Sequence, residues 1–561
     1  MNKFFKYIAP ATLLLLTVGA TSCTKDLNVE PIDPSLQFDV TPEQLINKCY
    51  GNFALAGNGG ADGDCDVNGI DGGTSGLYRQ MWNSNELTTD EAICGWGDEG
   101  IPEFCHNSYD ATHPMLRGYY YRLTTGIMFD NQYLTEFRDY NKTMSAEVRF
   151  LRAMNYYLLL DAFGNVPFKT DISTDKAPRI ERAELFKFIE KELKTIVGES
   201  VENAENADEV LADPQPKKEG QAGFGRVDKA AAWLLLARMY LNAEVYTGTA
   251  RWADAATYAK KVMDSPYVLL TNGSSKEVNG ETWDWTPYQM LFMGDNGKTD
   301  AAYEGIFTLL SDSRRTTSWG VSLYLIASTF DGDMHAHPYL PDPVNGVTGQ
   351  AWSGNRARPE LVRLFFPNDD APDAAQYEVA QFAGDDRALF YTEGRKLNVE
   401  DESVFTNGFA VAKFTNFTTD GSAVGAGDNR MPNMNVFMMR KAEAYLTYAE
   451  ALARQNGGIA PAEALAALNV LRNRAHASVL SSANLNTILD EWGREFFFEG
   501  RRRIDLVRHN KFGGNTGYNW QWKGGVYAGR NFDAYRNIFD IPQSDIIANN
   551  NLQHNPGYPL K

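Results

Sequence analysis

Pairs of amphipathic helices, separated by long segments without periodicity, are the feature that most constrains the fold of this 561-residue chain. The stretch SAEVRFLRAMNYYLLLDAFG has apolar residues at three- and four-residue steps, with Ser145 as a candidate N-cap and Gly164 at its end. Small alanines and aromatics at fixed offsets are typical of tetratricopeptide-type helix pairs. The sequence therefore predicts a mostly α-helical scaffold, with further helices at residues 225–246, 252–265, 439–458, 460–476 and 488–499.

The segments between these pairs are rich in Gly, Asp, Asn, Pro and Trp. Connections of such length are rare in compact domains unless they carry function, so their aromatic residues are candidates for a binding site. We expect a single body, residues 23–561, in which the helices support a loop-rich lobe. The scaffold is expected mainly at 40–56, 116–266 and 437–512, and the lobe mainly at 57–115, 267–436 and 513–561.

The first 22 residues have the pattern of a signal peptide, with a basic start, a short apolar run and small residues. Ala20-Thr21-Ser22-Cys23 resembles a bacterial lipobox, which predicts lipidation of Cys23 and a lipid-anchored body. The alternative is ordinary secretion, with Cys23 as a bystander. No later segment is long and apolar enough to predict a membrane span.

Composition and motifs disfavour two classes of function. The net charge of −19 argues against binding nucleic acid, whose phosphates need a basic surface. No metalloprotease, serine-hydrolase or P-loop motif is present. A glycoside hydrolase stays open, because its paired carboxylates need only meet in the fold. His335 and His337, near Asp331 and Asp333, form either a metal site or a plain polar loop.

Four cysteines follow Cys23, and their spacing matches no zinc motif. In an exported protein they are either disulfide-bonded or buried as free thiols, and both alternatives remain open at this point. They are Cys49, Cys65, Cys94 and Cys105.

A charged motif near the C-terminus, REFFFEGRRRIDLVR, combines apolar residues with acids and arginines. We interpret it as a structural ion-pair cluster, in which Glu495 and Glu499 pair with arginines in and around Arg501–Arg503. Ligand binding is the alternative.

Several stretches resemble the SusD/RagB family of outer-membrane glycan-binding lipoproteins, in the family's order. They are AEVRFLRAMNYYLLLDAFGNVPF, GRVDKAAAWLLLARMYLNAEVY, RKAEAYLTYAEALAR, DEWGREFFFEGRRRIDLVRHNKF and IPQSDIIANNNLQHNPGY. The resemblance implies a SusD-like fold, in which a tetratricopeptide-type superhelix carries an irregular glycan-binding lobe. It also implies a surface-exposed, non-catalytic lipoprotein that passes glycan to a SusC-like TonB-dependent transporter of the outer membrane.

The loops are most similar to those of the family's starch-binding founding member, which implies binding of starch or maltooligosaccharides. The stretches GLYRQMWNSNELTTDEAICGW, TSWGVSLYL and GQAWSGNRARPELV place Trp96, Trp319 and Trp352 at its aromatic platforms, and Arg79 near the site. Asp98 and Glu99 are further candidates for contacts with sugar hydroxyls. Cys94 departs from the pattern, which has a second tryptophan there, so a β-glucan, fructan or host oligosaccharide remains an alternative ligand.

Each aromatic candidate also has a structural alternative. Trp96 and Trp352 are either platforms or loop anchors, and Trp319 precedes a strand-like apolar run that could belong to the core. Arg79 could be a buried ion-pair partner. Trp283 and Trp285 alternate as on a strand edge and fit either role.

No cofactor is expected. The founding member's calcium site would correspond to Asp295 and to the segment NRMPNMNV, residues 429–436. Calcium prefers carboxylates to the asparagines found there, so we do not predict calcium binding.

Overall fold

The computed structural model describes residues 40–63, 65–73, 75–278, 280–334, 344–421 and 430–559. Its internal contacts group residues 46–561 into one compact unit and residues 1–45 into another, of which residues 40–45 are described. The predicted signal peptide and Cys23 lie outside the described residues.

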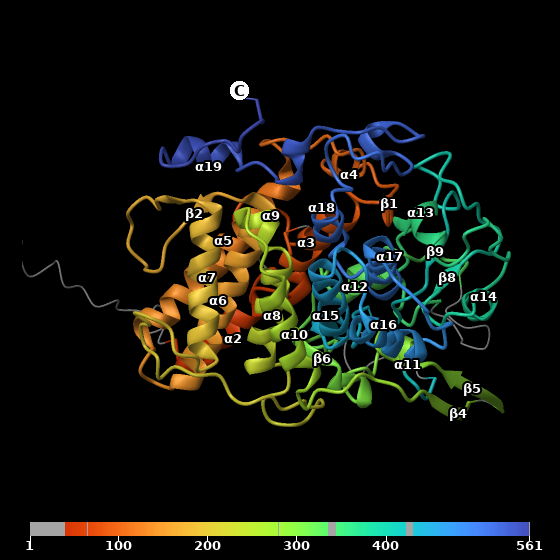
Figure 1. Ribbon diagram of the computed structural model, residues 1–561, viewed down its shortest axis with the longest axis horizontal. Coiled ribbons are helices and arrows are strands. Elements are labelled where there is room, and N and C mark those ends of the chain that lie inside the picture. The colour runs from red at the N-terminus through yellow and green to blue at the C-terminus, as the bar shows by residue number, and fades with distance from the viewer. Residues whose placement is uncertain are drawn as a thin grey trace, which may run out of the picture. The chain divides into compact units, whose positions relative to one another are not determined.

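Helices dominate the chain (Figure 1). They are α2 (Pro42–Gly51), α3 (Leu77–Glu86), α4 (Ile101–Cys105), α5 (Pro114–Glu136), α6 (Lys142–Phe163), α7 (Arg182–Ile196), α8 (Lys229–Leu241), α9 (Ala243–Thr247), α10 (Trp252–Met263), α11 (Pro287–Met290), α12 (Ser322–Ala327), α13 (Pro359–Val362), α14 (Gln376–Ala383), α15 (Ala442–Gln455), α16 (Ala462–Arg474), α17 (Leu485–Phe496), α18 (Arg502–Arg508) and α19 (Gln543–Ala548).

The strands are short and, within the described residues, pair only in twos, all antiparallel. The pairs are β1 (Ala92–Cys94) with β7 (Asn355–Ala357), β2 (Val166–Pro167) with β3 (Arg179–Ile180), β4 (Ser274–Val278) with β5 (Glu281–Trp285), β6 (Gly305–Leu309) with β10 (Val436–Arg440), and β8 (Phe390–Tyr391) with β9 (Ala410–Val411).

The predicted helical scaffold is confirmed. Helix α5 packs on α6, α6 on α7, α8 on α10, α10 on α15 and α15 on α16. Figure 1 shows helices α5 to α10 on one side and the loop-rich segments around β4, β5, β8, β9 and α14 on the opposite side. Among the described residues, no helix combines the length and the apolar character needed to cross a membrane.

Two predicted helix boundaries are wrong. Helix α6 begins one turn before Ser145, because Asn141 caps it by accepting a hydrogen bond from the Met144 amide at 3.1 Å. Gly164 ends this helix as predicted, at a φ of 70°. The helix predicted over 225–246 is broken at Asn242, where α8 ends and α9 begins. The Asn242 side chain bonds the Arg238 carbonyl at 2.9 Å, and such side-chain bonds compete with helix continuation.

Three further segments either differ from the predicted structure or distinguish between the alternatives that the sequence left open. The segment predicted as a helix from residue 439 begins in strand β10, because Val436–Arg440 pairs with β6. The run after Trp319 is helix α12 rather than a strand. Trp283 and Trp285 lie on β5 as predicted, but both are buried, at 1% and 7% exposure, so they belong to the core.

Candidate functional site

Strand pairing brings two distant tryptophans together. Strand β1 ends at Cys94, two residues before Trp96, and β7 begins three residues after Trp352. Their ladder places Cys94 opposite Asn355 and continues as a hydrogen bond from the Gly95 amide to the Gly354 carbonyl, at 3.2 Å. The Trp96 indole Nε1 then donates to the Trp352 carbonyl at 3.0 Å.

Trp96, Trp352 and Trp319 form a continuous row of rings, here called the tryptophan arc. The Trp96 and Trp352 ring centroids are 6.2 Å apart at an interplanar angle of 52°, and those of Trp352 and Trp319 are 6.3 Å apart at 38°. All three side chains are half-buried. The structure therefore brings the three predicted platform residues together, and neighbouring rings in the row are not coplanar.

Each indole nitrogen in the arc is bound to the protein. Trp352 Nε1 donates to Gln350 Oε1 at 2.8 Å, and Trp319 Nε1 donates to the Ala61 carbonyl at 2.8 Å. Because Trp96 Nε1 also donates a hydrogen bond, the polar edge of each of the three indole rings is fixed in position. The rings are thus held in defined orientations, which lowers the entropic cost of binding a ligand on their faces.

Glycines make room for the arc. A Cβ atom at Gly354 would lie 2.3 Å from the Trp96 ring, so only glycine allows the indole to pack on that backbone. By contrast, Gly97, the residue after Trp96, is exposed, and a Cβ atom there would meet no atom within 4 Å outside its chain neighbours. Trp96 is therefore packed against the Gly354 backbone, and the loop that follows it is exposed.

Arg79 lies beneath the arc. This α3 side chain is 9% exposed, and its guanidinium carbon is 4.6 Å from the Tyr324 ring centroid and 5.8 Å from that of Trp96. Arg79 Nη1 donates to the Gly73 carbonyl at 2.8 Å. The arginine thus supports the aromatic rings by cation–π contacts, and among the described residues it forms no ion pair. Its contact with a glycan stays a prediction.

Asp98 and Glu99 lie on an exposed turn between Trp96 and α4. The turn is closed by the Asp98 carbonyl, which accepts from the Ile101 amide at 3.0 Å. Their contact with a ligand remains a prediction, because the structure shows only that both side chains are exposed near the Trp96 loop.

Two residues that shape the arc were not predicted from the sequence. Tyr324, on α12, contacts Trp96 edge-on with ring centroids 6.2 Å apart. Gln350 orients Trp352, and its signal was its place two residues before the tryptophan in GQAWSGN. Tyr324 carried no such signal, because it sits in a run of apolar residues that reads as core.

The four described cysteines are free thiols, which decides between the two alternatives left open. Cys49, Cys94 and Cys105 are buried, and burial raises the pKa of Cys105 to about 11. Thiols in such surroundings stay neutral and unreactive. Cys94 therefore fills the space beneath the Trp96 loop as a small apolar group.

The metal candidates receive little support. His335 and His337 lie outside the described residues, while Asp331 pairs with Arg395. Within the described part of the chain, no three His, Cys, Asp or Glu side chains gather as a metal site. Asp295 Oδ2 accepts from the Thr419 amide and hydroxyl at 3.0 and 2.7 Å, so this lone carboxylate serves a loop contact. Asp295 Oδ1 is buried without a hydrogen-bond partner among the described residues, and Asn429 lies outside them, so the absence of calcium stays a prediction and a structural calcium its alternative.

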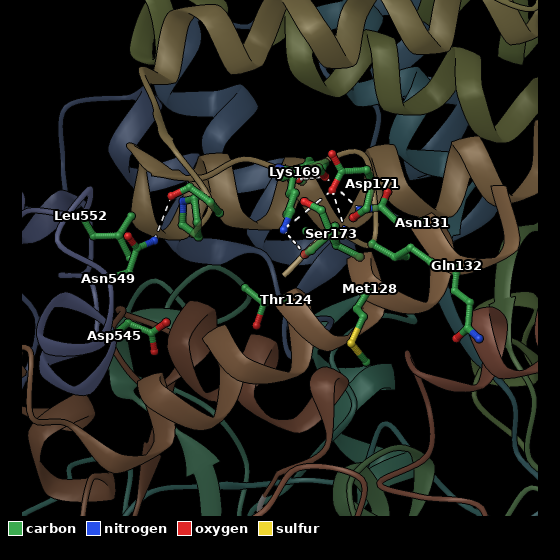
Figure 2. A pocket seen from close by; sticks show the side chains of 15 residues that line it. Thr124, Met128, Asn131, Gln132, Lys169, Asp171, Ser173, Asp545, Asn549 and Leu552 are labelled. Carbon is green, nitrogen blue, oxygen red and sulfur yellow. Dashed lines mark hydrogen bonds and ion pairs between the residues drawn. The ribbon is translucent and has the colours of Figure 1, made fainter. Parts of the chain in front are cut away.

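A cavity of about 460 Å³ lies away from the arc, between α5, the β2–β3 connection and α19 (Figure 2). Its walls include Ile127, Met128 and Ile172, and Asn131 fixes the connection by donating to the Lys169 carbonyl at 3.0 Å. None of the predicted site residues lines it.

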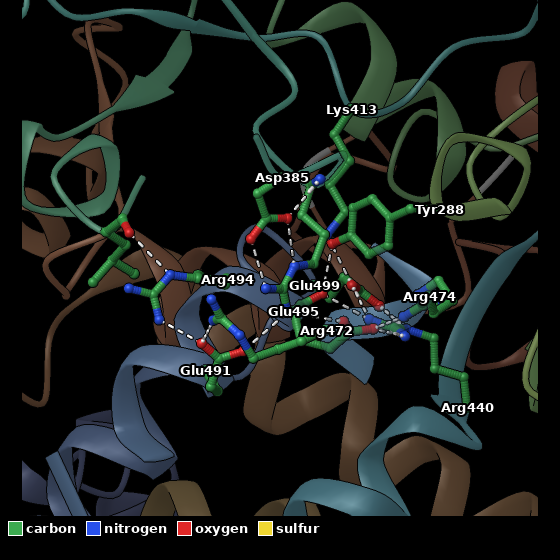
Figure 3. A network of polar contacts seen from close by, with 12 residues as sticks. Tyr288, Asp385, Lys413, Arg440, Arg472, Arg474, Glu491, Arg494, Glu495 and Glu499 are labelled. Atoms are coloured by element: carbon green, nitrogen blue, oxygen red, sulfur yellow. Dashed lines mark hydrogen bonds and ion pairs between the residues drawn. The ribbon is translucent and has the colours of Figure 1, made fainter. Parts of the chain in front are cut away.

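The charged C-terminal motif is a buried network, as predicted, but the predicted partners are wrong (Figure 3). Glu495 Oε1 lies 2.6 Å from Arg440 Nη1, and Glu495 also pairs with Arg474 and, at 3.5 Å, with Arg387. Glu499 Oε1 lies 2.8 Å from Arg440 Nη2.

Two arginines of the motif, Arg502 and Arg503, pair with acids outside it, whereas Arg501 pairs with Asp505 of the motif itself. Arg502 Nε lies 2.8 Å from Asp90 Oδ1, and Arg503 pairs with Asp161. Gly500 and Phe498 have positive φ values of 78° and 63°, so the chain turns sharply between α17 and α18. This turn directs the acids and the arginines to different partners.

Comparisons with known proteins agree with this architecture. A sequence profile of the SusD family matches residues 379–558. The chain is 36% identical to the starch-binding protein SusD of Bacteroides thetaiotaomicron, over 99% of this chain and 100% of that protein. It is 25% identical to the SusD-like protein P2 of Formosa agariphila, with 75% of each covered.

Solved structures show the same fold. The surface glycan-binding protein A from Bacteroides fluxus matches with a TM-score of 0.62 at 19% identity, covering 92% of this chain and 99% of that one. A SusD homolog from Bacteroides thetaiotaomicron VPI-5482 matches with a TM-score of 0.64 at 18% identity, covering 92% and 96%. The fold and the loop-borne aromatic rings thus define a SusD-like protein. The chain belongs to the SusD family.

Proposed function

We propose that this protein is a cell-surface lipoprotein that captures starch or maltooligosaccharides, has no catalytic activity, and delivers the glycan to a SusC-like TonB-dependent transporter of the outer membrane. The observation that carries the proposal is the tilt between neighbouring rings of the tryptophan arc, none of which are coplanar. An α-1,4-linked glucan is naturally curved, and rings tilted by 52° and 38° in succession can each stack on the apolar face of one glucose ring. A flat β-1,4 chain would suit coplanar rings instead.

Three further observations support the proposal. The 36% identical relative is named a starch-binding protein. The exposed Asp98 and Glu99, beside Trp96, are able to accept hydrogen bonds from sugar hydroxyls. The lipobox-like Ala20–Cys23 stretch supports a lipid anchor, which holds a captured glycan close to an outer-membrane transporter.

Native affinity electrophoresis tests glycan capture. The full chain, purified in a detergent without a sugar headgroup, is run in gels that contain amylopectin, a mixed-linkage β-glucan or levan. We expect retardation in amylopectin alone and its loss in Trp96→Ala. Phe382→Ala serves as the control, because Phe382 is an aromatic residue that is 71% exposed on α14. Retardation by another glycan would overturn the α-glucan specificity, and retardation by none would overturn glycan capture.

Three assays test the remaining parts of the proposal. Prolonged incubation with amylopectin should release no reducing sugar, and release of sugar would identify a glycoside hydrolase instead. Cys23→Ala should move the protein from the membrane fraction to the soluble fraction, and a variant that stays membrane-bound would contradict the lipid anchor. Co-purification with a TonB-dependent transporter would support delivery.

A further inference from the structure

A second aromatic group lies in the segment after α18, outside the tryptophan arc. The Trp522 and Tyr527 ring centroids are 5.9 Å apart at 82°, so the two rings form a corner. Trp522 is half-buried, like the arc tryptophans, and Tyr527 is 41% exposed. The ring of His106 lies 5.8 Å from that of Trp522 at 31°.

The protein holds Trp522 in a costly conformation. Its φ of 66° is in the left-handed region, which is unusual for a bulky residue and is found mostly where surrounding structure or function requires it. The Trp522 amide donates to the Tyr527 carbonyl at 3.2 Å, and its indole Nε1 donates to the Val399 carbonyl at 2.9 Å. As in the arc, the polar edge is bound and the ring orientation is fixed.

Polar groups border this corner. His106 Nε2 and Glu402 Oε2 are 2.9 Å apart, with side chains 29% and 22% exposed. Gln521 Nε2 donates to Asn398 Oδ1 at 2.8 Å, close to the Tyr527 hydroxyl at 3.4 Å. Flat apolar rings edged by hydrogen-bonding groups provide what a sugar ring needs, since a pyranose has an apolar face and a rim of hydroxyls.

Glu402 connects the corner to the loop that carries Trp96. The Glu402 carboxylate faces His106. A Cβ atom added at Gly95 would lie 2.6 Å from the Glu402 carbonyl oxygen, so the backbones of Glu402 and Gly95 are in contact. Arg356 joins both sides, because Nη2 donates to the Glu402 carbonyl at 2.5 Å and Nη1 to the Gly354 carbonyl at 3.2 Å. The buried Arg356 therefore joins the segment beside the corner to the backbone of the tryptophan arc.

We infer that Trp522 and Tyr527 form a second sugar-stacking platform, which binds a pyranose ring of the same glucan chain beyond the part held by the tryptophan arc. This inference rests on the proposed function and extends it to chain length. The arc alone binds a short oligosaccharide, whereas a polymer also contacts the corner and gains affinity because the second contact is intramolecular.

Calorimetric titration of the full chain in detergent, with amylopectin and with maltotriose, tests the inference. Trp522→Gly removes the ring and suits the backbone, because glycine readily adopts a positive φ. Tyr527→Ala removes the exposed partner. We expect each variant to bind amylopectin about three- to tenfold more weakly and to bind maltotriose with less than a twofold change.

Two controls separate the possible outcomes. Tyr140→Ala, which removes a 58% exposed ring from another part of the surface, should leave both affinities unchanged. Urea unfolding shows whether each variant is folded at the titration temperature. Unchanged amylopectin affinity in both folded variants, with wild-type binding intact, would overturn the second platform alone. Failure of the wild type to bind any α-glucan would overturn the platform together with the proposed function.

Discussion

The Arg440–Glu495 network and the tryptophan arc differ in whether their side chains make all their contacts inside the protein or leave ring surface accessible. In the network, Arg440, Arg474, Glu304 and Glu495 have fully buried side chains, and their charges are directed at one another. In the arc, only the polar indole edges are bound to the protein, and the half-buried rings keep surface available. The first arrangement stabilises the scaffold, and the second leaves apolar surface for a ligand.

This comparison separates two kinds of mutational effect. Changes in the network should alter the free energy of unfolding and leave glycan affinity intact in the folded protein. Changes at the arc should lower glycan affinity and leave the free energy of unfolding nearly unchanged.

The largest effect is expected for Glu495→Ala. Burial alone would raise the pKa of Glu495, but the guanidinium groups of Arg474 and Arg440 lower it to about 2, so the group is a buried anion. Its removal leaves buried arginines without a counter-charge and should lower the free energy of unfolding by about 3–5 kcal/mol. Urea unfolding followed by circular dichroism measures the change.

The matched control for Glu495→Ala is Glu184→Gln, which removes the charge of an exposed carboxylate that pairs with Lys187 on the same helix. This control should leave the unfolding midpoint nearly unchanged. An equal shift in both variants would contradict the structural role of the network.

The next largest effect is the pH dependence of the free energy of unfolding that we expect from Asp130, a scaffold residue on α5. Burial raises its pKa to about 7, although Asn155 Nδ2 donates to Oδ2 at 2.9 Å. The folded protein thus keeps the proton to higher pH than the unfolded chain. The free energy of unfolding that Asp130 contributes therefore falls by up to about 4 kcal/mol as the pH rises from about 4 to about 7.

Asp130→Asn should remove that pH-dependent contribution. Urea unfolding of wild type and variant at pH 4.5 and pH 8 measures it, and the variant should gain stability relative to wild type at the higher pH. Equal pH dependence in both proteins would show that Asp130 does not titrate in this range. Glycan affinity should be the same in both at each pH, because Asp130 lies in the scaffold.

A smaller effect is expected for Gly354→Ala, which places a methyl group against the Trp96 ring and displaces it. We expect amylopectin affinity to fall about tenfold, or about 1.4 kcal/mol, as measured by calorimetry. Gly97→Ala is the control from the same loop, where the added methyl group meets no neighbour within 4 Å. Similar affinities for the two variants would indicate that Trp96 does not need its packed position to bind glycan.

Periodic features of the fold could be predicted from sequence. The apolar spacing in residues 145–164 gave the main body of α6 and its end at Gly164, because a glycine at positive φ ends a helix without strain. Its start was missed, since Asn141 and Ser145 are both good capping residues and only the structure shows that Ser145 Oγ instead donates to the Arg138 carbonyl, at 2.7 Å.

Partners across long sequence separations could not be predicted. The acids of the C-terminal motif were assigned to neighbouring arginines, whereas Glu495 pairs with Arg440, Arg474 and Arg387 from other elements. A buried carboxylate accepts any arginine that the fold brings close, which is a neighbour in sequence for Asp505, paired with Arg501 and Arg508, and a distant residue for Glu495. The sharp turn at Phe498–Gly500 decides the outcome.

The three tryptophans of the arc were predicted from the sequence, but the contacts that hold them in place were not. Glycines and acids around Trp96 indicated a surface loop, and the resemblance to the family added Trp319 and Trp352. The supporting contacts of Tyr324 and Gly354 depend on β1 pairing with β7, which joins segments that are far apart in the sequence. The corner at Trp522 was not singled out, because its surface position depends on a backbone conformation that the sequence does not reveal.

Calorimetric titration with maltoheptaose and cellohexaose, of wild type and Trp352→Ala, tests the central claim most directly. Trp352 is the middle ring, so its removal interrupts the row while Trp96 and Trp319 remain. Wild type should bind maltoheptaose and not cellohexaose, and Trp352→Ala should weaken maltoheptaose binding at least tenfold, with little change in its urea midpoint. Equal wild-type affinity for both oligosaccharides, or unchanged maltoheptaose binding in the variant, would contradict recognition of a curved glucan by the arc.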